Sequence, residues 1–137
     1  MSLFKIFDTA SSGMSAQSMR LNLVSSNMAN VDSISSSMAE TYRARQPVFR
    51  AMLDNLNPDK PAAGVRVAGV VESQTPLRRE YQPNHPLADE EGYIFRPNVN
   101  MVEEMANMIS ASRSYQSNVE VVNSAKQMMA ATLRLGE

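Results

Sequence analysis

Hydrophobic residues recur every three or four positions at both ends of the chain. Near the N-terminus the steps alternate between four and three, and only Gln17 among the repeated positions is polar. The repeat consists of Leu3, Phe7, Ala10, Met14, Gln17, Leu21, Val24, Met28 and Val31. A hydrophobic period of 3.5 residues sustained over several heptads is typical of helices that supercoil around one another. We therefore predict that residues 1–33 form a coiled-coil helix.

The C-terminal end repeats this spacing. Its positions, eight of ten apolar, are Met101, Met105, Met108, Ser112, Tyr115, Val119, Val122, Lys126, Met129 and Leu133. Asn100 precedes the repeat as a helix N-cap, and Glu103 and Glu104 complement the positive end of the helix dipole. Arg134 and Gly136 form a typical C-terminal stop. We predict a second coiled-coil helix over residues 99–137 and expect both repeats to pack between helices or subunits.

All seven prolines lie between positions 47 and 97, where they exclude long helices. Residues 34–98 therefore form a middle segment of short strands and loops. Loose alternation predicts a strand over 41–50, and valines with a period of two predict one over 65–73, with a loop over 54–64 between them. Residues 77–81 and 92–96 are candidates for one further strand each. The predicted fold is mainly α: two long terminal helices pair as a coiled coil around a small β-ribbon segment.

Composition excludes several classes of function. Thirteen basic and fourteen acidic residues give a net charge of −1, without the basic excess that dominates nucleic-acid binding. The absence of cysteine excludes disulfides and thiol catalysis. No apolar run is as long as a membrane span, and the N-terminus lacks the apolar stretch of a secretory signal peptide. We expect no enzyme, no cofactor, no metal and no small-molecule substrate.

Two clusters leave a chemical alternative open. His85 with Asp89, Glu90 and Glu91 could hold a metal, which would make the chain an enzyme. A turn over residues 83–86 followed by a solvated acidic loop is the simpler interpretation, because one histidine supplies too few ligands.

The second cluster is basic. Arg43, Arg45 and Arg50 lie near Tyr42 and Phe49, a combination that could contact nucleic acid. The neutral total charge favours a strand that faces solvent or a protein partner.

The polar face of the N-terminal helix carries little charge. Between positions 3 and 31 only Lys5, Asp8 and Arg20 are charged, whereas Ser, Thr, Asn and Gln occupy eleven positions. Helices that face bulk water usually carry paired Lys and Glu residues. We therefore expect close contact with other protein or an uncharged aqueous wall. Gly13 costs such a helix about 1 kcal/mol relative to alanine, so it should mark a close packing contact or a flexible point.

Residues 12–22 and 26–32 resemble the N-terminal helix of bacterial flagellar rod and hook proteins. Asn27, Ala29, Asn30 and Val31 match the motif that ends this helix, whereas residues 32–33 (Asp-Ser) depart from the usual threonine pattern. Further similarity covers residues 81–93, 97–100, 110–123 and 126–129. The proline–histidine–tyrosine stretch and the short chain favour a proximal rod subunit within this axial family.

The resemblance implies a non-catalytic subunit of the periplasmic rod, exported without a cleaved signal peptide, that transmits motor torque. Its terminal helices would line the axial export channel. Implied partners are further copies, the B-, F- and G-type rod proteins, the adaptor that joins rod to membrane ring, and the flagellar type III export apparatus. Two alternatives remain: a soluble helical-hairpin adaptor or chaperone, and another axial subunit.

Overall fold

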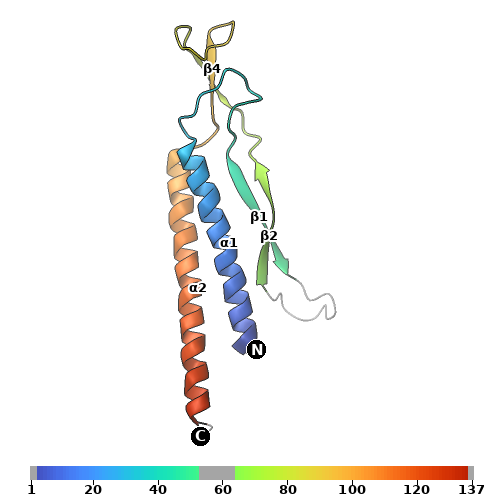
Figure 1. Cartoon of the computed structure of the whole chain (residues 1–137), viewed down its shortest axis with the longest axis vertical. Helices are drawn as coiled ribbons and strands as arrows, with labels where there is room; N and C mark the ends of the chain where they lie inside the picture. Colours follow the sequence, from blue (N-terminus) through green and yellow to red (C-terminus); the bar gives the residue numbers. More distant parts are fainter. Residues whose placement is uncertain (1–2, 53–63, 136–137) are drawn as a thin grey trace.

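The computed structural model describes residues 3–52 and 64–135. Helix α1 (Leu3–Ala29) and helix α2 (Met101–Leu135) run antiparallel, side by side, and α2 continues past the start of α1 (Figure 1). Four short strands lie between them in sequence. The prediction of two long helices that flank a small β segment is confirmed. Neither helix in the described part of the chain is long and apolar enough to cross a membrane.

The strands form two separate antiparallel ribbons. Strand β1 (Arg45–Met52) pairs with β2 (Gly64–Glu72) beside α1, with an irregularity between Val48 and Phe49. Strand β3 (Arg78–Tyr81) pairs with β4 (Tyr93–Arg96) beyond the end of the helix pair (Figure 1). Both predicted strands and both candidate strands therefore exist, although β1 begins four residues later than expected. The predicted loop over 54–64 lies outside the described residues except for Gly64.

The apolar side chains buried along the two helices are mostly small. Ala10, Ala16 and Val24 are buried on α1, and Ala111 and Ala125 are buried on α2. Buried alanines allow two helix backbones to approach closely, but they remove little apolar surface from water. The helix pair is therefore close but has a thin apolar core.

Gly13 lies at a close contact between the two helices. A Cβ atom at this position would lie 2.9 Å from Nδ2 of Asn118. The absence of a side chain at Gly13 therefore allows a close packing contact, the first of the two expectations for this glycine. One and two heptads further along α1 are Arg20, whose Nη2 donates to Oδ1 of Asn107 at 2.9 Å, and the buried Asn27. Polar residues thus occupy heptad positions of the helix contact.

The observed helix ends agree with the capping analysis. Oδ1 of Asn100 accepts the amide N–H of Val102 at 3.1 Å, which confirms Asn100 as the N-cap of α2. At the end of α1, Nδ2 of Asn30 donates to the carbonyl oxygen of Ser26 at 2.8 Å. Arg134 lies in the last turn of α2. The predicted stop at Gly136 lies outside the described residues.

The β3–β4 ribbon encloses a second small core. Ile94 is fully buried and Phe95 nearly so. Phe95 and Ser35 exchange two backbone hydrogen bonds of 3.1 and 3.0 Å, which attach the segment after α1 to β4. Gly92 turns the hairpin with a φ of 85°, a left-handed conformation that glycine adopts without steric cost. This ribbon is therefore tied to the end of α1.

Candidate functional site

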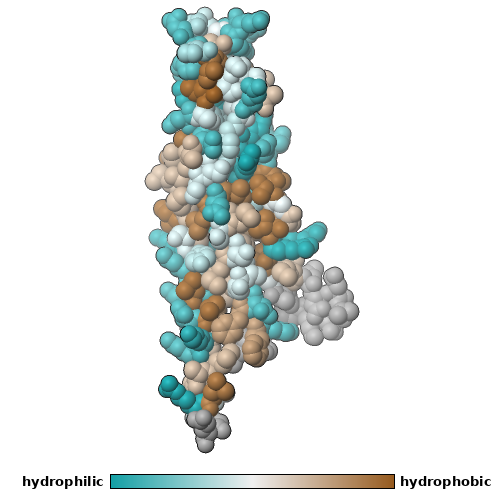
Figure 2. Space-filling view, in the orientation of Figure 1, coloured by the Kyte–Doolittle hydropathy of each residue, from teal (hydrophilic) through white to brown (hydrophobic). Residues whose placement is uncertain are grey.

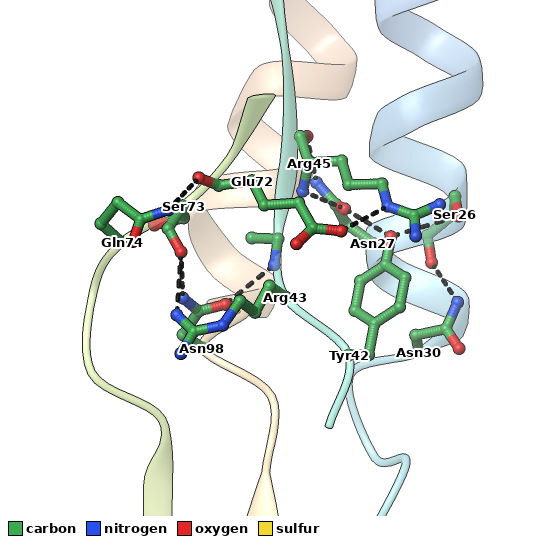
Figure 3. Close-up of polar contacts among 11 residues, drawn as sticks. Ser26, Asn27, Asn30, Tyr42, Arg43, Arg45, Glu72, Ser73, Gln74 and Asn98 are labelled. Atoms are coloured by element: carbon green, nitrogen blue, oxygen red, sulfur yellow. Dashed lines mark hydrogen bonds and ion pairs between the residues drawn. The ribbon is translucent and has the colours of Figure 1, made fainter. Parts of the chain in front are cut away.

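The end of α1, the start of α2 and the ends of β1 and β2 meet in a polar cluster, which we call the junction (Figure 3). At its centre Asn27 is 1% exposed. Nδ2 of Asn27 donates to the carbonyl oxygen of Arg45 at 2.9 Å and to Oε2 of Glu104 at 3.0 Å. Its Oδ1 accepts the hydroxyl of Tyr42 at 2.8 Å and the amide N–H of Arg45 at 2.9 Å. One side chain thus joins α1, β1 and α2.

The four contacts use the full hydrogen-bonding capacity of the Asn27 amide. An unpaired polar group in a buried position costs about 1–3 kcal/mol, so this arrangement leaves few alternatives for the side chain. Glu104, which is also buried, presents a carboxylate oxygen to the amide from the first turn of α2. The junction therefore fixes where β1 leaves the helix pair.

Asn98 provides a second connection. Its Oδ1 accepts the amide N–H of Ala44 at 2.8 Å, and its Nδ2 donates to the carbonyl oxygens of Ser73 and Thr75 at 3.2 and 2.8 Å. The amide N–H of Ser73 in turn donates to the carbonyl oxygen of Ala44 at 2.8 Å. The chain that enters α2 is thus bound to the beginning of β1 and to the end of β2 (Figure 3).

Two of the arginines in the basic cluster are used inside the chain. Nη1 of Arg43 donates to the carbonyl oxygen of Ser73 at 3.2 Å. The guanidinium of Arg45 lies 5.3 Å from the ring centre of Tyr42 and pairs with Glu72 at 3.5 Å. These contacts give the side chains a structural role in the junction and weaken the case for nucleic-acid binding.

The motif residues that carried the family resemblance lie at this end of α1. Asn27 is the centre of the junction, and Asn30 caps the helix. Ala29 is the last residue of α1 and is exposed, whereas Val31 is half-buried. The two asparagines of the motif thus perform different tasks, one between segments and one within the helix.

The hydrophobic repeat is only partly covered within one chain. Ala10 and Val24 are buried, whereas the exposed members are Met101, Met105, Tyr115, Lys126 and Leu133. The side chain of Leu3 lies outside the described part of the structure. The remaining members named as packing positions are half-buried: Phe7, Met14, Leu21, Met28, Val31, Met108, Val119, Val122 and Met129. That these positions pack between helices or subunits stays a prediction.

His85 and the acidic residues near it take part in turns. Nδ1 of His85 accepts the amide N–H of Leu87 at 3.1 Å. Oδ1 of Asp89 accepts the amides of Glu91 and Tyr93 at 3.0 and 2.7 Å. Within residues 3–52 and 64–135, no group of three or more His, Asp or Glu side chains is placed to hold a metal ion.

Sequence reasoning missed the roles of Tyr42, Asn98 and Glu104. Their partners lie between 15 and 77 positions away in sequence. The placement of Glu104 near a helix start suggested a dipole contact instead. The only available signal was the concentration of asparagine at both helix ends.

Comparison with known proteins connects both helices to one biological context. Residues 7–33 match the family described as "Flagella basal body rod protein", and residues 90–135 match "Flagellar basal body rod FlgEFG protein C-terminal". The matched segments include α1 and α2 almost completely. Both describe rod proteins of the flagellar basal body.

Full-length relatives narrow the assignment. The chain is 51% identical to "Flagellar basal-body rod protein FlgC" of Escherichia coli O6:H1 over 137 residues, with 100% of both chains covered. It is 50% identical to the FlgC protein of Salmonella typhimurium at the same coverage. The FlgC protein of Borreliella burgdorferi is 38% identical over 149 residues, with 98% of both chains covered.

The chain belongs to the FlgC family of flagellar basal-body rod proteins. It is a structural rod subunit of the bacterial flagellar basal body, and its context is motility. The prediction of a non-enzymatic building block is confirmed.

Proposed function

We propose that this subunit assembles into the proximal part of the periplasmic rod and transmits motor torque. In this arrangement α1 and α2 pack with the helices of neighbouring subunits as a coiled-coil layer around the axial export channel. The junction holds the β1–β2 ribbon at a fixed position relative to the helices. A load applied to the outer segments then reaches the inner helices through hydrogen bonds rather than through a flexible linker.

The observation that carries this proposal is the exposure of large apolar side chains on α2. The exposed fractions are 75% for Val102, 50% for Met105, 54% for Ile109 and 69% for Leu133. Figure 2 shows hydrophobic residues spread over the surface instead of enclosed by polar ones. Exposed apolar surface on this scale is typical of a protein that is covered by partners.

The same reasoning supports the choice of partners. Membership of the rod family supports contacts with further copies, with the B-, F- and G-type rod proteins and with the adaptor at the membrane ring. Delivery through the flagellar type III export apparatus, without a cleaved signal peptide, is part of the proposal. Helix α1 has ten uncharged polar positions, and all of them except the buried Asn27 fit a wall past which other chains travel without binding.

A substitution on α2 tests the proposal. Met105→Asp puts a charge on a half-exposed apolar position, where burial against a neighbour would cost several kcal/mol. We expect loss of motility and loss of the chain from isolated basal bodies, at unchanged cellular abundance. Ser110→Asp, at an exposed polar position of the same helix, is the matched control. Normal incorporation of Met105→Asp would contradict the proposed packing.

The alternative of a soluble adaptor or chaperone makes a different prediction. An adaptor would remain in the cytoplasm as a stable monomer and would be absent from isolated basal bodies. Immunoblots of purified basal bodies and of the soluble fraction therefore distinguish the two functions directly.

A further inference from the structure

Two arginines face each other across the β1–β2 ribbon. Arg50 and Arg66 are directly paired in the strand register, and both are exposed. Val65 and Val67, on either side of Arg66, are half-buried, and the amide N–H of Val65 donates to Oγ of Ser12 on α1 at 3.1 Å. Because successive side chains of a strand alternate between faces, Arg66 and its partner lie on the more exposed face of the ribbon.

Neither guanidinium has an ion pair or hydrogen bond with another described residue. Like charges directly opposite on a ribbon destabilise it, because the side chains lie about 5 Å apart. An acidic partner would reverse this effect by placing a carboxylate between the two cations. Met52 is also exposed and lies on the same face of β1 as Arg50, which adds apolar surface beside the charges.

The chain carries an acidic turn of suitable chemistry at its other end. Residues 89–91, in the β3–β4 hairpin, read Asp-Glu-Glu. The carboxylate of Asp89 accepts backbone hydrogen bonds within the turn. Glu91 pairs with Arg79 at 2.6 Å, although its side chain is 73% exposed. Glu90 is exposed and has no ion pair among the described residues.

We propose that the Arg50–Arg66 pair binds the acidic turn of a second copy of this chain, centred on Glu90. The inference rests on the proposed rod assembly. The hairpin lies beyond one end of the helix pair, whereas the β1–β2 ribbon runs beside α1 toward the other end (Figure 1). A contact between unlike surfaces on successive copies is heterologous, so it repeats in the same direction and produces an open helical row.

Disulfide cross-linking in assembled basal bodies tests this contact, because the natural chain contains no cysteine. The variant carries Arg66→Cys and Glu90→Cys together, and each single substitution is a control. We expect the double variant to give a ladder of dimers and larger multimers after mild oxidation. A mixture of the two single variants should stop at dimers.

The outcomes separate this proposal from the proposed function. Dimers from Arg66→Cys alone would show that the contact is symmetric. If basal bodies contained the double variant but gave no cross-links, the arginines would not bind the acidic turn. Either result overturns the proposal and leaves the rod assignment intact. Absence of the unmodified chain from basal bodies would instead refute the rod assembly itself.

Charge reversal provides a second measurement in case the cysteine variant does not assemble. We expect Arg50→Glu with Arg66→Glu to reduce incorporation about tenfold, and Glu90→Arg to restore part of it. Arg50→Lys with Arg66→Lys keeps both charges and should assemble nearly normally. A loss that Glu90→Arg does not relieve would contradict a contact between these two surfaces and would indicate a different acidic partner.

Discussion

The junction and the distal part of α2 use opposite means of stabilisation. In the junction, buried polar groups such as Asn27 and Glu104 are paired within the chain. In the distal part of α2, Met128 and Leu133 expose 53% and 69% of their surface, and the helix extends past α1 (Figure 1). Hydrogen bonds within the chain hold the junction together. The distal part of α2 instead exposes apolar side chains that a single chain does not bury.

This difference separates the shape of the subunit from its assembly. Hydrogen bonds have strict geometry, so the junction sets the direction in which the ribbons leave the helices. Apolar contacts are less directional, and flexible methionine side chains adapt to slightly different neighbours. A subunit with a fixed junction and adaptable helices can therefore occupy positions with non-identical surroundings.

Removal of the central junction amide should have the largest effect. Asn27→Ala leaves Glu104 and the backbone of Arg45 without partners, so we expect the free energy of unfolding to fall by about 2–4 kcal/mol. Chemical denaturation of the purified chain measures this change. Asn22→Ala, an exposed asparagine of the same helix, should change it by at most about 0.5 kcal/mol. Equal effects of the two substitutions would contradict a specific junction.

A smaller effect is expected where the helices approach most closely. Gly13→Ala should add about 1 kcal/mol of helix propensity, but the new Cβ crowds Asn118, whose amide donates to the carbonyl oxygen of Ser114. We expect little net change from Gly13→Ala alone. In an Asn118→Ala background, Gly13→Ala should raise the free energy of unfolding by the whole helix-propensity gain of about 1 kcal/mol.

A double-mutant cycle with these two positions measures the coupling in the free energy of unfolding. A coupling of about 1 kcal/mol would show that α1 and α2 pair in the purified chain. Additive effects would show that the glycine does not contact Asn118 in solution.

The smallest predicted effect concerns the β3–β4 ribbon. Hydrogen bonds from the side chains of Gln82 and Arg96 lower the pKa of Glu80. Because the folded-state pKa lies below the unfolded value, this contribution to stability is present above the unfolded pKa and is lost as the pH falls through the folded pKa. Glu80→Gln should therefore be slightly less stable than the natural chain at neutral pH, and the difference should disappear in acid. A difference that persisted in acid would exclude this electrostatic origin.

Local sequence signals were sufficient for the elements of the fold. The proline-free ends predicted both helices, Asn100 predicted the start of α2, and alternating patterns predicted the first two strands. These features depend on contacts between residues close in sequence, which is why they can be read directly. The start of β1 was placed too early, because residues 42–44 are bound in the junction instead of being paired with β2.

Tertiary contacts could not be predicted in the same way. The hydrophobic repeat identified the helices, but Gly13, Arg20 and Asn27, which contact α2, lie outside it, and Met105 and Leu133 remain exposed. A heptad pattern does not distinguish contacts inside a chain from contacts between subunits. The junction likewise depends on side chains from three segments, for which no spacing rule exists. The family motif marked Asn27 without revealing its partners.

The most direct test compares hydrogen exchange of the purified chain with exchange of the same chain in isolated basal bodies. The central claim is that the junction is stabilised within one subunit and the helix ends by their neighbours. We predict that amides around residues 27, 44–45 and 98–104 are protected in both states. Amides at the start of α1 and in the last turns of α2 should be protected only after assembly. Equal protection of both regions in the purified chain would contradict the claim.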